Sequence, residues 1–169
     1  YSQIKDEALA IWDIVNEFYG VFNLPLQIRL SLRDPSEPEK YLGGEKTWGM
    51  AEKILREVVK SRHVSAKEAI GEAAFYGPKI DFIAKDSLGR EWQVATIQLY
   101  MNQPERFDLF CVNEKGEHER IAMIHAAIMG SLERFIAPLI EHFAGKFPVW
   151  LSPVQVKILP VSEKFLNYG

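Results

Sequence analysis

The stretch KIDFIAKDSLGREWQVATIQL, Lys79 to Leu99, decides the fold prediction for this chain. Two strand-like runs, 79–86 and 90–99, are separated by a Ser-Leu-Gly turn, and this pattern predicts an antiparallel hairpin. Thr96 and Gln98 lie two positions apart, so they share one face of the second strand. Buried hydroxyl and amide groups must be paired. These two side chains therefore face water on an open side of the sheet, or they line a cleft that binds a polar ligand.

The segments on either side of the hairpin predict an α+β fold with a mostly antiparallel sheet flanked by helices. Apolar residues at three- and four-residue spacing indicate helices, and strict alternation indicates strands. Before the hairpin we expect a helix over 4–22, a strand over 26–33 and a helix over 47–61. After it we expect a second hairpin (107–112 and 119–126), a helix over 132–143 and a strand over 154–161.

Composition places the chain in the ordinary globular class. It has 169 residues, of which 47% are hydrophobic and 25% charged, with a formal net charge of -3. Such a charge gives no global basic field for nucleic acid. The single cysteine rules out an intramolecular disulfide and fits a reducing, cytoplasmic compartment. We expect no membrane association, because no apolar run approaches membrane-spanning length and the first residues lack the layout of a signal peptide.

The segment MIHAAIMGSLERF, Met123 to Phe135, contains a cation in an unusual place. Ser131 is a natural N-cap, which puts Arg134 in the first turn of the predicted helix. The helix dipole favours anions there, so the arginine needs another reason, such as an anionic ligand beside the free backbone amides. The alternative is a surface ion pair of Arg134 with Glu133 or Glu141.

Two further polar residues have an ordinary interpretation beside a functional one. Lys79 begins a strand after the turn Gly77-Pro78, where it could meet a phosphate or carboxylate as a point charge, yet most lysines are simply solvated. His125 ends a predicted strand, and a lone histidine is more often structural than a metal ligand, because a metal needs three or four donors. Taken alone, these residues indicate an α+β domain with a possible polar cleft on its sheet.

Five segments together carry a family resemblance: AAFYGPKIDF, GREWQVATIQL, PERFDL, MIH…GSLERF and FPVWLSPVQV. In this order they resemble the catalytic domain of threonyl-tRNA synthetases over essentially the whole chain. The resemblance implies the class II aminoacyl-tRNA synthetase core fold and an ATP-dependent threonine–tRNA ligase activity. It also implies threonine, ATP and tRNA as binding partners, with zinc and magnesium as cofactors of the parent family.

The same resemblance implies roles for individual residues. Arg134, with Ser131 beside it, matches a position that binds ATP, and Gln93 and Thr96 match positions that contact the adenylate. Tyr76 and Gln98 match positions around the threonine, and Lys79 matches a basic residue near the reacting groups. His125 matches one of three protein ligands of a zinc ion.

The match also predicts an incomplete site. The other two zinc ligands of the family and its first and second class-defining motifs lie upstream of the matched region. We expect residues 1–150 to be a partial catalytic domain and residues 151–169 to be a linker with the first strand of an anticodon-binding domain. This stretch alone is therefore expected to be inactive and to hold neither zinc nor magnesium-ATP.

Some positions depart from the family pattern and suggest a second function. Tyr100 stands where an acidic residue is usual, Phe110 where a small polar residue is usual, and Ala126 where an arginine is usual. With Met101 and Met129, the two aromatic residues could form an exposed apolar patch. The alternative hypothesis is thus a non-catalytic binding module that contacts a protein partner, or a second copy, through exposed sheet surface.

Overall fold

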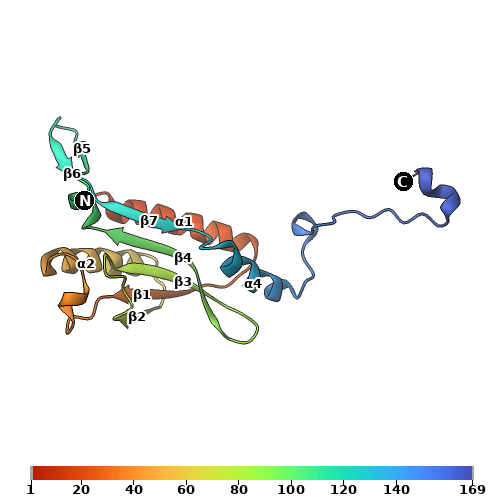
Figure 1. Ribbon diagram of the computed structural model, residues 1–169, viewed down its shortest axis with the longest axis horizontal. Coiled ribbons are helices and arrows are strands. Elements are labelled where there is room, and N and C mark those ends of the chain that lie inside the picture. The colour runs from red at the N-terminus through yellow and green to blue at the C-terminus, as the bar shows by residue number, and fades with distance from the viewer. Residues whose placement is uncertain (1, 169) are drawn as a thin grey trace.

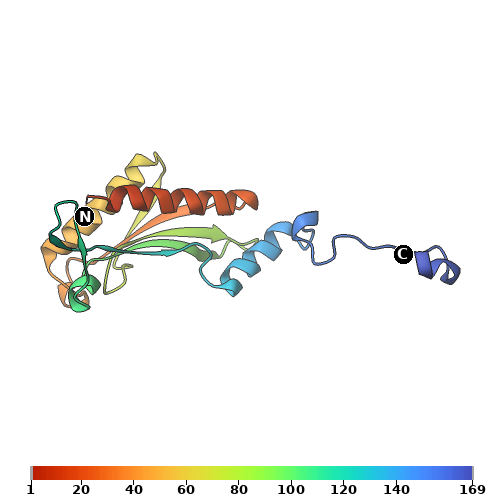
Figure 2. The same cartoon turned by 90° about the horizontal axis from the view of Figure 1, so that it is seen from above.

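The protein is described by a computed structural model covering residues 2–168. A five-stranded sheet with the order β2-β1-β3-β4-β7 forms its body. Helices α1 and α2 cover one face of this sheet, and α4 lies at one end (Figures 1 and 2). The helices are α1 (Ile4–Val21), α2 (Glu45–Ser61), the short α3 (Gln103–Arg106) and α4 (Leu132–Phe143). The strands of the sheet are β1 (Gln27–Leu32), β2 (Ala66–Ile70), β3 (Lys79–Lys85), β4 (Glu91–Tyr100) and β7 (Met123–Ala127).

The predicted hairpin over 79–99 is confirmed and lies at the centre of the sheet. β3 pairs antiparallel with β4, with a register shift that leaves Val94 without a partner on β3. Because of this bulge, Val94 and Ala95 are both buried in the core. The bulge also shifts the alternation of side chains, so that Gln93 shares the opposite face with Thr96, to which it donates a hydrogen bond of 3.4 Å.

The core lies between the sheet and the helices α1 and α2. Trp12 of α1 meets Phe82 of β3 edge to face, with ring centroids 5.0 Å apart, and both side chains are buried. Farther along α1, the Tyr19 hydroxyl lies 3.0 Å from the Val94 carbonyl and 2.9 Å from the Ile128 carbonyl. Burial raises the pKa of this phenol, so it stays a hydrogen-bond donor. These contacts fix α1 against both β4 and the chain that follows β7.

Most predicted elements are confirmed, but the second hairpin is shorter than expected. Only β5 (Phe110–Val112) and β6 (His118–Arg120) pair with each other. The predicted strand over 119–126 breaks after β6, and its second half forms β7, which pairs with β4 instead. The run 119–126 thus contributes to two sheets. Its second half pairs with β4, a strand with buried residues, and not with the small hairpin.

The sequence reading missed β2, which pairs in parallel with β1. This edge strand has only five residues, AKEAI, two of them charged, so it carries no alternation of the kind that indicates a strand. Glu68 on β2 forms an ion pair with Arg56 of α2 at 2.8 Å. Because β2 pairs in parallel with β1, the sheet is mixed, although the other three of its four strand pairings are antiparallel.

The predicted strand over 154–161 is wrong. This segment has no strand partner among residues 2–168 and leads away from the body of the protein (Figure 1). Val156 and Val161 are 81% and 94% exposed. Apolar alternation alone does not make a strand, because the backbone groups of a strand must bond to a neighbouring one. The expected domain boundary at 150–151 remains a prediction.

The contact between Trp12 and Phe82 predicts a large effect of truncation in the core. We expect Phe82→Ala to lower the free energy of unfolding by about 3–5 kcal/mol, because it leaves a cavity beneath α1. Urea titration followed by circular dichroism measures this difference. Leu88→Ala is the control, since Leu88 is 76% exposed and its truncation should change stability by less than about 0.5 kcal/mol. Equal small effects of the two changes would contradict the described core.

Candidate functional site

Helices α1 and α2 leave one face of the sheet uncovered (Figure 2). Polar side chains of neighbouring strands lie in register on this face. Directly opposed residues of neighbouring strands share a face, so pairing decides which side chains meet. One row across β3, β4 and β7 consists of Lys79, Gln98 and His125. The adjacent row begins with Asp81 and Thr96. The antiparallel pairings thus bring residues far apart in the sequence onto one surface.

A cleft of about 440 Å³ lies over these rows. Its lining includes all eight residues singled out from the sequence: Tyr76, Lys79, Gln93, Thr96, Gln98, His125, Ser131 and Arg134. They come from the loop before β3, from β3, β4 and β7, and from the start of α4. The cleft answers the question left open for Thr96 and Gln98, because both are buried at its floor rather than solvated.

The polar groups of the floor are held in place by hydrogen bonds within the protein. Gln98 donates from Nε2 to the Gly77 carbonyl at 3.1 Å. Gly77 lies so close to β4 that a Cβ atom there would meet the Leu99 carbonyl oxygen at 1.9 Å, so only glycine fits. Thr96 donates to Asp81 Oδ1 at 2.7 Å. Such groups are oriented before any ligand arrives.

Asp81 is the site residue that the sequence reading missed. Its side chain is completely buried, and besides Thr96 it accepts a hydrogen bond from the Ser31 hydroxyl at 2.7 Å. Lys79 forms an ion pair with the same carboxylate, and Arg29 lies 3.6 Å from it. Lys79 is thus not the solvated lysine of the ordinary interpretation. An acidic residue inside the apolar run of β3, two positions after a lysine, was the available signal.

Arg134 lies at the end of the cleft that α4 forms. Ser131 caps the helix as predicted, with its hydroxyl accepting from the Arg134 backbone N–H at 3.3 Å. Gly130, with φ of 68°, approaches the Val94 carbonyl so closely that a Cβ would lie 3.1 Å from its oxygen. Neither predicted ion pair of Arg134 forms: within residues 2–168 its guanidinium has no carboxylate partner. The side chain is exposed and available to an anion.

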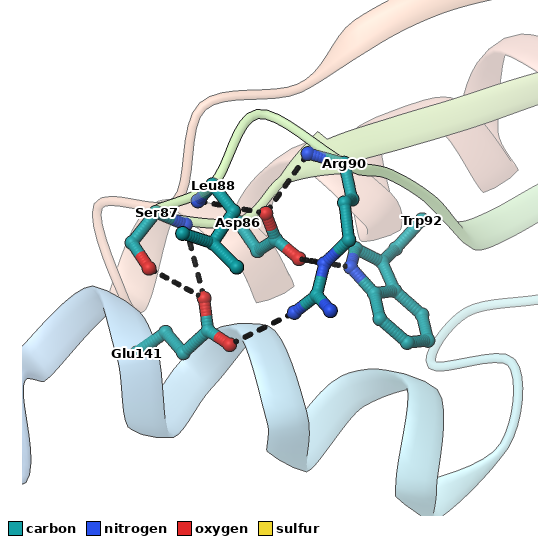
Figure 3. Close-up of polar contacts among 6 residues, drawn as sticks. All are labelled: Asp86, Ser87, Leu88, Arg90, Trp92 and Glu141. Carbon is teal, nitrogen blue, oxygen red and sulfur yellow. Dashed lines mark hydrogen bonds and ion pairs between the residues drawn. The ribbon is translucent and has the colours of Figure 1, made fainter.

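Glu141, one of the proposed partners of Arg134, instead joins α4 to the turn between β3 and β4 (Figure 3). Its carboxylate accepts from the Ser87 backbone N–H at 3.0 Å and from the Ser87 hydroxyl at 2.8 Å. Arg90 reaches the other oxygen of Glu141 at 3.3 Å and also pairs with Asp86. Because Glu141 and Arg134 are two helical turns apart on α4, this contact helps to fix the helix that presents Arg134 to the cleft.

The opposite end of the cleft is aromatic. The Tyr100 ring stacks on His125, with centroids 5.4 Å apart and an interplanar angle of 21°. Tyr76 meets Tyr100 edge to face at 4.9 Å. Burial, together with hydrogen bonding to Tyr76, raises the pKa of Tyr100 to about 12, so its phenol is neutral near pH 7. The cleft therefore has a cationic end at Arg134 and an aromatic end at Tyr100 and His125.

The described residues, 2–168, do not form a complete zinc site. His125 offers an imidazole at the cleft, but residues 2–168 contain no group of three or more histidine, cysteine or acidic side chains placed to hold a metal ion. Zinc in proteins takes three or four protein ligands. The predicted role of His125 as a metal ligand is thus that of one ligand among several.

The apolar patch of the alternative hypothesis is not assembled. Met101 is buried, with 6% of its surface exposed. Phe110 lies on β5, where it stacks on His118 with centroids 4.3 Å apart. Tyr100 is engaged with the aromatic rings of the cleft, and Met129 packs against the core. Met101 therefore does not contribute to an exposed patch, and the binding module stays a prediction.

Comparison with known proteins yields a family and close relatives. Residues 1–143 match the family model of the class II tRNA synthetase core domain (G, H, P, S and T). The chain is 48% identical to the threonine–tRNA ligase of Phocaeicola vulgatus over 169 residues, which is 99% of this chain and 26% of that ligase. It is also 48% identical to the threonine–tRNA ligase of Desulforamulus reducens, with 99% and 26% covered.

A solved structure of a threonyl-tRNA synthetase domain has the same fold. The RNA binding domain of threonyl-tRNA synthetase from Cryptosporidium parvum superposes with a TM-score of 0.89 at 37% identity, over 99% of this chain and 41% of that one. The resemblance noted from the sequence is therefore confirmed. The chain spans about a quarter of the length of the curated relatives it matches. Among the described residues, no helix is long and apolar enough to cross a membrane.

We expect the turn between β3 and β4, which contacts α4, to make the stability of the fold depend on pH. Burial on its own would raise the pKa of Asp86, but hydrogen bonds from Trp92, Arg90 and the backbone lower it to about 2. Because an unfolded aspartate has a pKa of roughly 3.9, this carboxylate stabilises the fold above about pH 4, and the stabilisation is lost as the pH falls towards 2. We expect Asp86→Asn to lower the thermal unfolding midpoint at neutral pH.

The difference in thermal unfolding midpoint between Asp86→Asn and the unsubstituted chain should become smaller as the pH is lowered to about 2.5. Differential scanning calorimetry at several pH values measures it. Glu114→Gln, in the exposed turn of the β5–β6 hairpin, is the control and should leave the midpoint unchanged throughout. A gap that stays constant down to low pH would show that the Asp86 charge is not the source of the stabilisation.

Proposed function

The chain belongs to the family of class II tRNA synthetase core domains, and we propose that it forms part of the catalytic domain of an ATP-dependent threonine–tRNA ligase. The observation that carries this proposal is the single cleft lined by all eight residues that the family resemblance singles out. The family model covers synthetases for several amino acids, and the identity of 48% to threonine–tRNA ligases supports threonine as the amino acid in this proposal.

The reaction proceeds in two steps. A carboxylate oxygen of threonine attacks the α-phosphorus of ATP, a bond forms between them, and the bond to pyrophosphate breaks. The terminal ribose hydroxyl of tRNA then attacks the threonyl carbonyl and AMP leaves with the electron pair. Neither step needs a covalent enzyme intermediate, so the protein acts by positioning the reactants and by stabilising negative charge.

The polarity of the cleft suits such a substrate. Arg134, which has no acidic partner within residues 2–168, would bind phosphate oxygens at the cationic end, beside the start of α4. Gln93 and Thr96 on β4 would contact the adenylate in the middle. Gln98 and Tyr76 would surround the threonine, with Lys79 close to the reacting groups. The order of these residues along β4 thus follows the order of groups along a threonyl-adenylate.

Several parts of the site would come from outside the 169 residues. His125 would supply one imidazole to a zinc ion that contacts threonine, and further ligands would have to join it. Magnesium, when bound, neutralises charge on the ATP phosphates. We place residues 1–150 in the catalytic domain and residues 151–169 at the start of the segment that follows it, in a protein that works in the cytoplasm.

The proposal is tested with a non-hydrolysable threonyl-adenylate analogue. We expect isothermal titration calorimetry to detect binding, and we expect Arg134→Ala to weaken it by about tenfold or more, because a charge-assisted contact to phosphate is lost. Arg106→Ala is the matched control: Arg106 is also exposed but lies on α3, outside the cleft. No binding by the unsubstituted chain, or equal weakening by both changes, would contradict the proposal.

The 169-residue stretch alone is expected not to catalyse threonine-dependent exchange of pyrophosphate into ATP and to hold far less than one zinc ion per chain. The reason is that His125 is a single ligand, and a protein zinc site needs about three or four. Radioactive exchange assays and metal analysis by mass spectrometry measure the two properties. Exchange above background, or stoichiometric zinc that resists dialysis, would show that the stretch is more complete than we propose.

A further inference from the structure

The centre of the open sheet face is occupied by a buried acid. The Asp81 side chain has no exposed surface, although it lies on the face that no helix covers. What shields it are the side chains that bind it, namely Lys79, Arg29, Ser31 and Thr96, from three different strands. An uncompensated carboxylate in such a place would be costly, so these partners are a condition of the fold.

The partners of Asp81 differ in how firmly they are held. Thr96 and Ser31 each donate a hydrogen bond of 2.7 Å, one to each carboxylate oxygen. Lys79 pairs closely with the oxygen that Ser31 also contacts, and only 14% of its side chain is exposed. Arg29 lies farther away, at 3.6 Å, with 25% of its side chain exposed, and its Nε is buried without a hydrogen-bond partner. Lys79 is therefore tethered, whereas Arg29 is loosely associated.

From this geometry we propose that Asp81 is a positioning residue, which holds the Lys79 ammonium and the Thr96 hydroxyl at the floor of the cleft. Both partners line the cleft, while the Asp81 carboxylate lies beneath them and does not. Since one carboxylate faces two cations, the cluster keeps one net positive charge. Of the two cations only Lys79 lines the cleft, and its ammonium suits a ligand whose middle portion is anionic. The assignment of that ligand as an adenylate phosphate rests on the proposed function.

A lysine held in this way acts differently from a mobile surface lysine. A free ammonium on a four-carbon stem loses side-chain entropy whenever it binds a phosphate. Lys79 has already lost that freedom through its contact with Asp81, so its charge is oriented in the unliganded protein. The Thr96 hydroxyl is oriented for the same reason, because its hydrogen points to Asp81 and its oxygen accepts from Gln93.

Chemical labelling of lysines tests the tether without any ligand. An acylating reagent followed by mass spectrometry measures the reaction rate of each amine. Lys85 is the internal reference, because it lies on the same strand with 46% of its side chain exposed. We expect Lys79 to react more slowly than Lys85, and we expect Asp81→Asn to raise the rate of Lys79 by about fivefold, since one ion pair is lost, while the rate of Lys85 stays constant.

Arg29→Gln separates a tether from a general loosening of the sheet. It removes the competing cation, so Lys79 becomes the one cation paired with the Asp81 carboxylate in this cluster, and the labelling of Lys79 should slow or stay unchanged. A faster reaction of Lys79 in Arg29→Gln would overturn the proposal. So would equal rates for Lys79 and Lys85 in the unsubstituted chain, or an unchanged Lys79 rate in a folded Asp81→Asn. Should Asp81→Asn not fold, the other two comparisons still decide.

Titration of the same proteins with the threonyl-adenylate analogue keeps the two proposals apart. If Asp81 positions Lys79 for phosphate, Asp81→Asn weakens binding by about tenfold. Altered labelling together with no binding by the unsubstituted chain would support the tether and contradict the ligase function. Unaltered labelling together with tight binding would support the ligase function and overturn the role of Asp81.

Discussion

The pairing of β3 with β4, with its single bulge at Val94, is the constraint on which the rest of the molecule depends. A regular strand sends alternate side chains to opposite faces, so a long strand with one buried face must alternate without error. The bulge lets Val94 and Ala95 both enter the core. It thereby places Gln93 on the same face as Thr96 and Gln98, and the three amide and hydroxyl groups form one continuous polar floor.

This arrangement divides the sheet into two faces that obey different rules. The face under α1 is filled by apolar contacts such as that of Trp12 with Phe82, which need only fit in shape. The cleft face carries polar groups with little solvent access, and each of those needs a partner. Asp81 supplies partners for two of them, and the Gly77 carbonyl supplies one for Gln98. These internal partners hold the polar groups of the floor in one orientation.

The sequence predicted what depends on local pattern and missed what depends on distant partners. The helices over 4–22, 47–61 and 132–143 and the central hairpin follow from spacing and turn residues, and all are present. The short edge strand β2 and the change of sheet between β6 and β7 depend on which neighbour is available, and no local pattern records that. The segment 154–161 shows the converse, since its alternation is strand-like but no partner lies beside it among the described residues.

The site divides in the same way. Family resemblance marked eight cleft residues, and strand register together with the loop before β3 and the start of α4 brings them to one cleft. Asp81 was missed because it is a single polar position in an apolar strand. The two cations of the cleft, Lys79 and Arg134, differ in exposure and in whether they have an acidic partner. Lys79 is largely buried and paired with a carboxylate, so its charge is oriented before a ligand binds. Arg134 is exposed at a helix start that disfavours cations, with no acidic partner within residues 2–168. A fixed charge can orient a reacting group, whereas a free charge can follow a phosphate into place, and the proposed binding of an adenylate would use both.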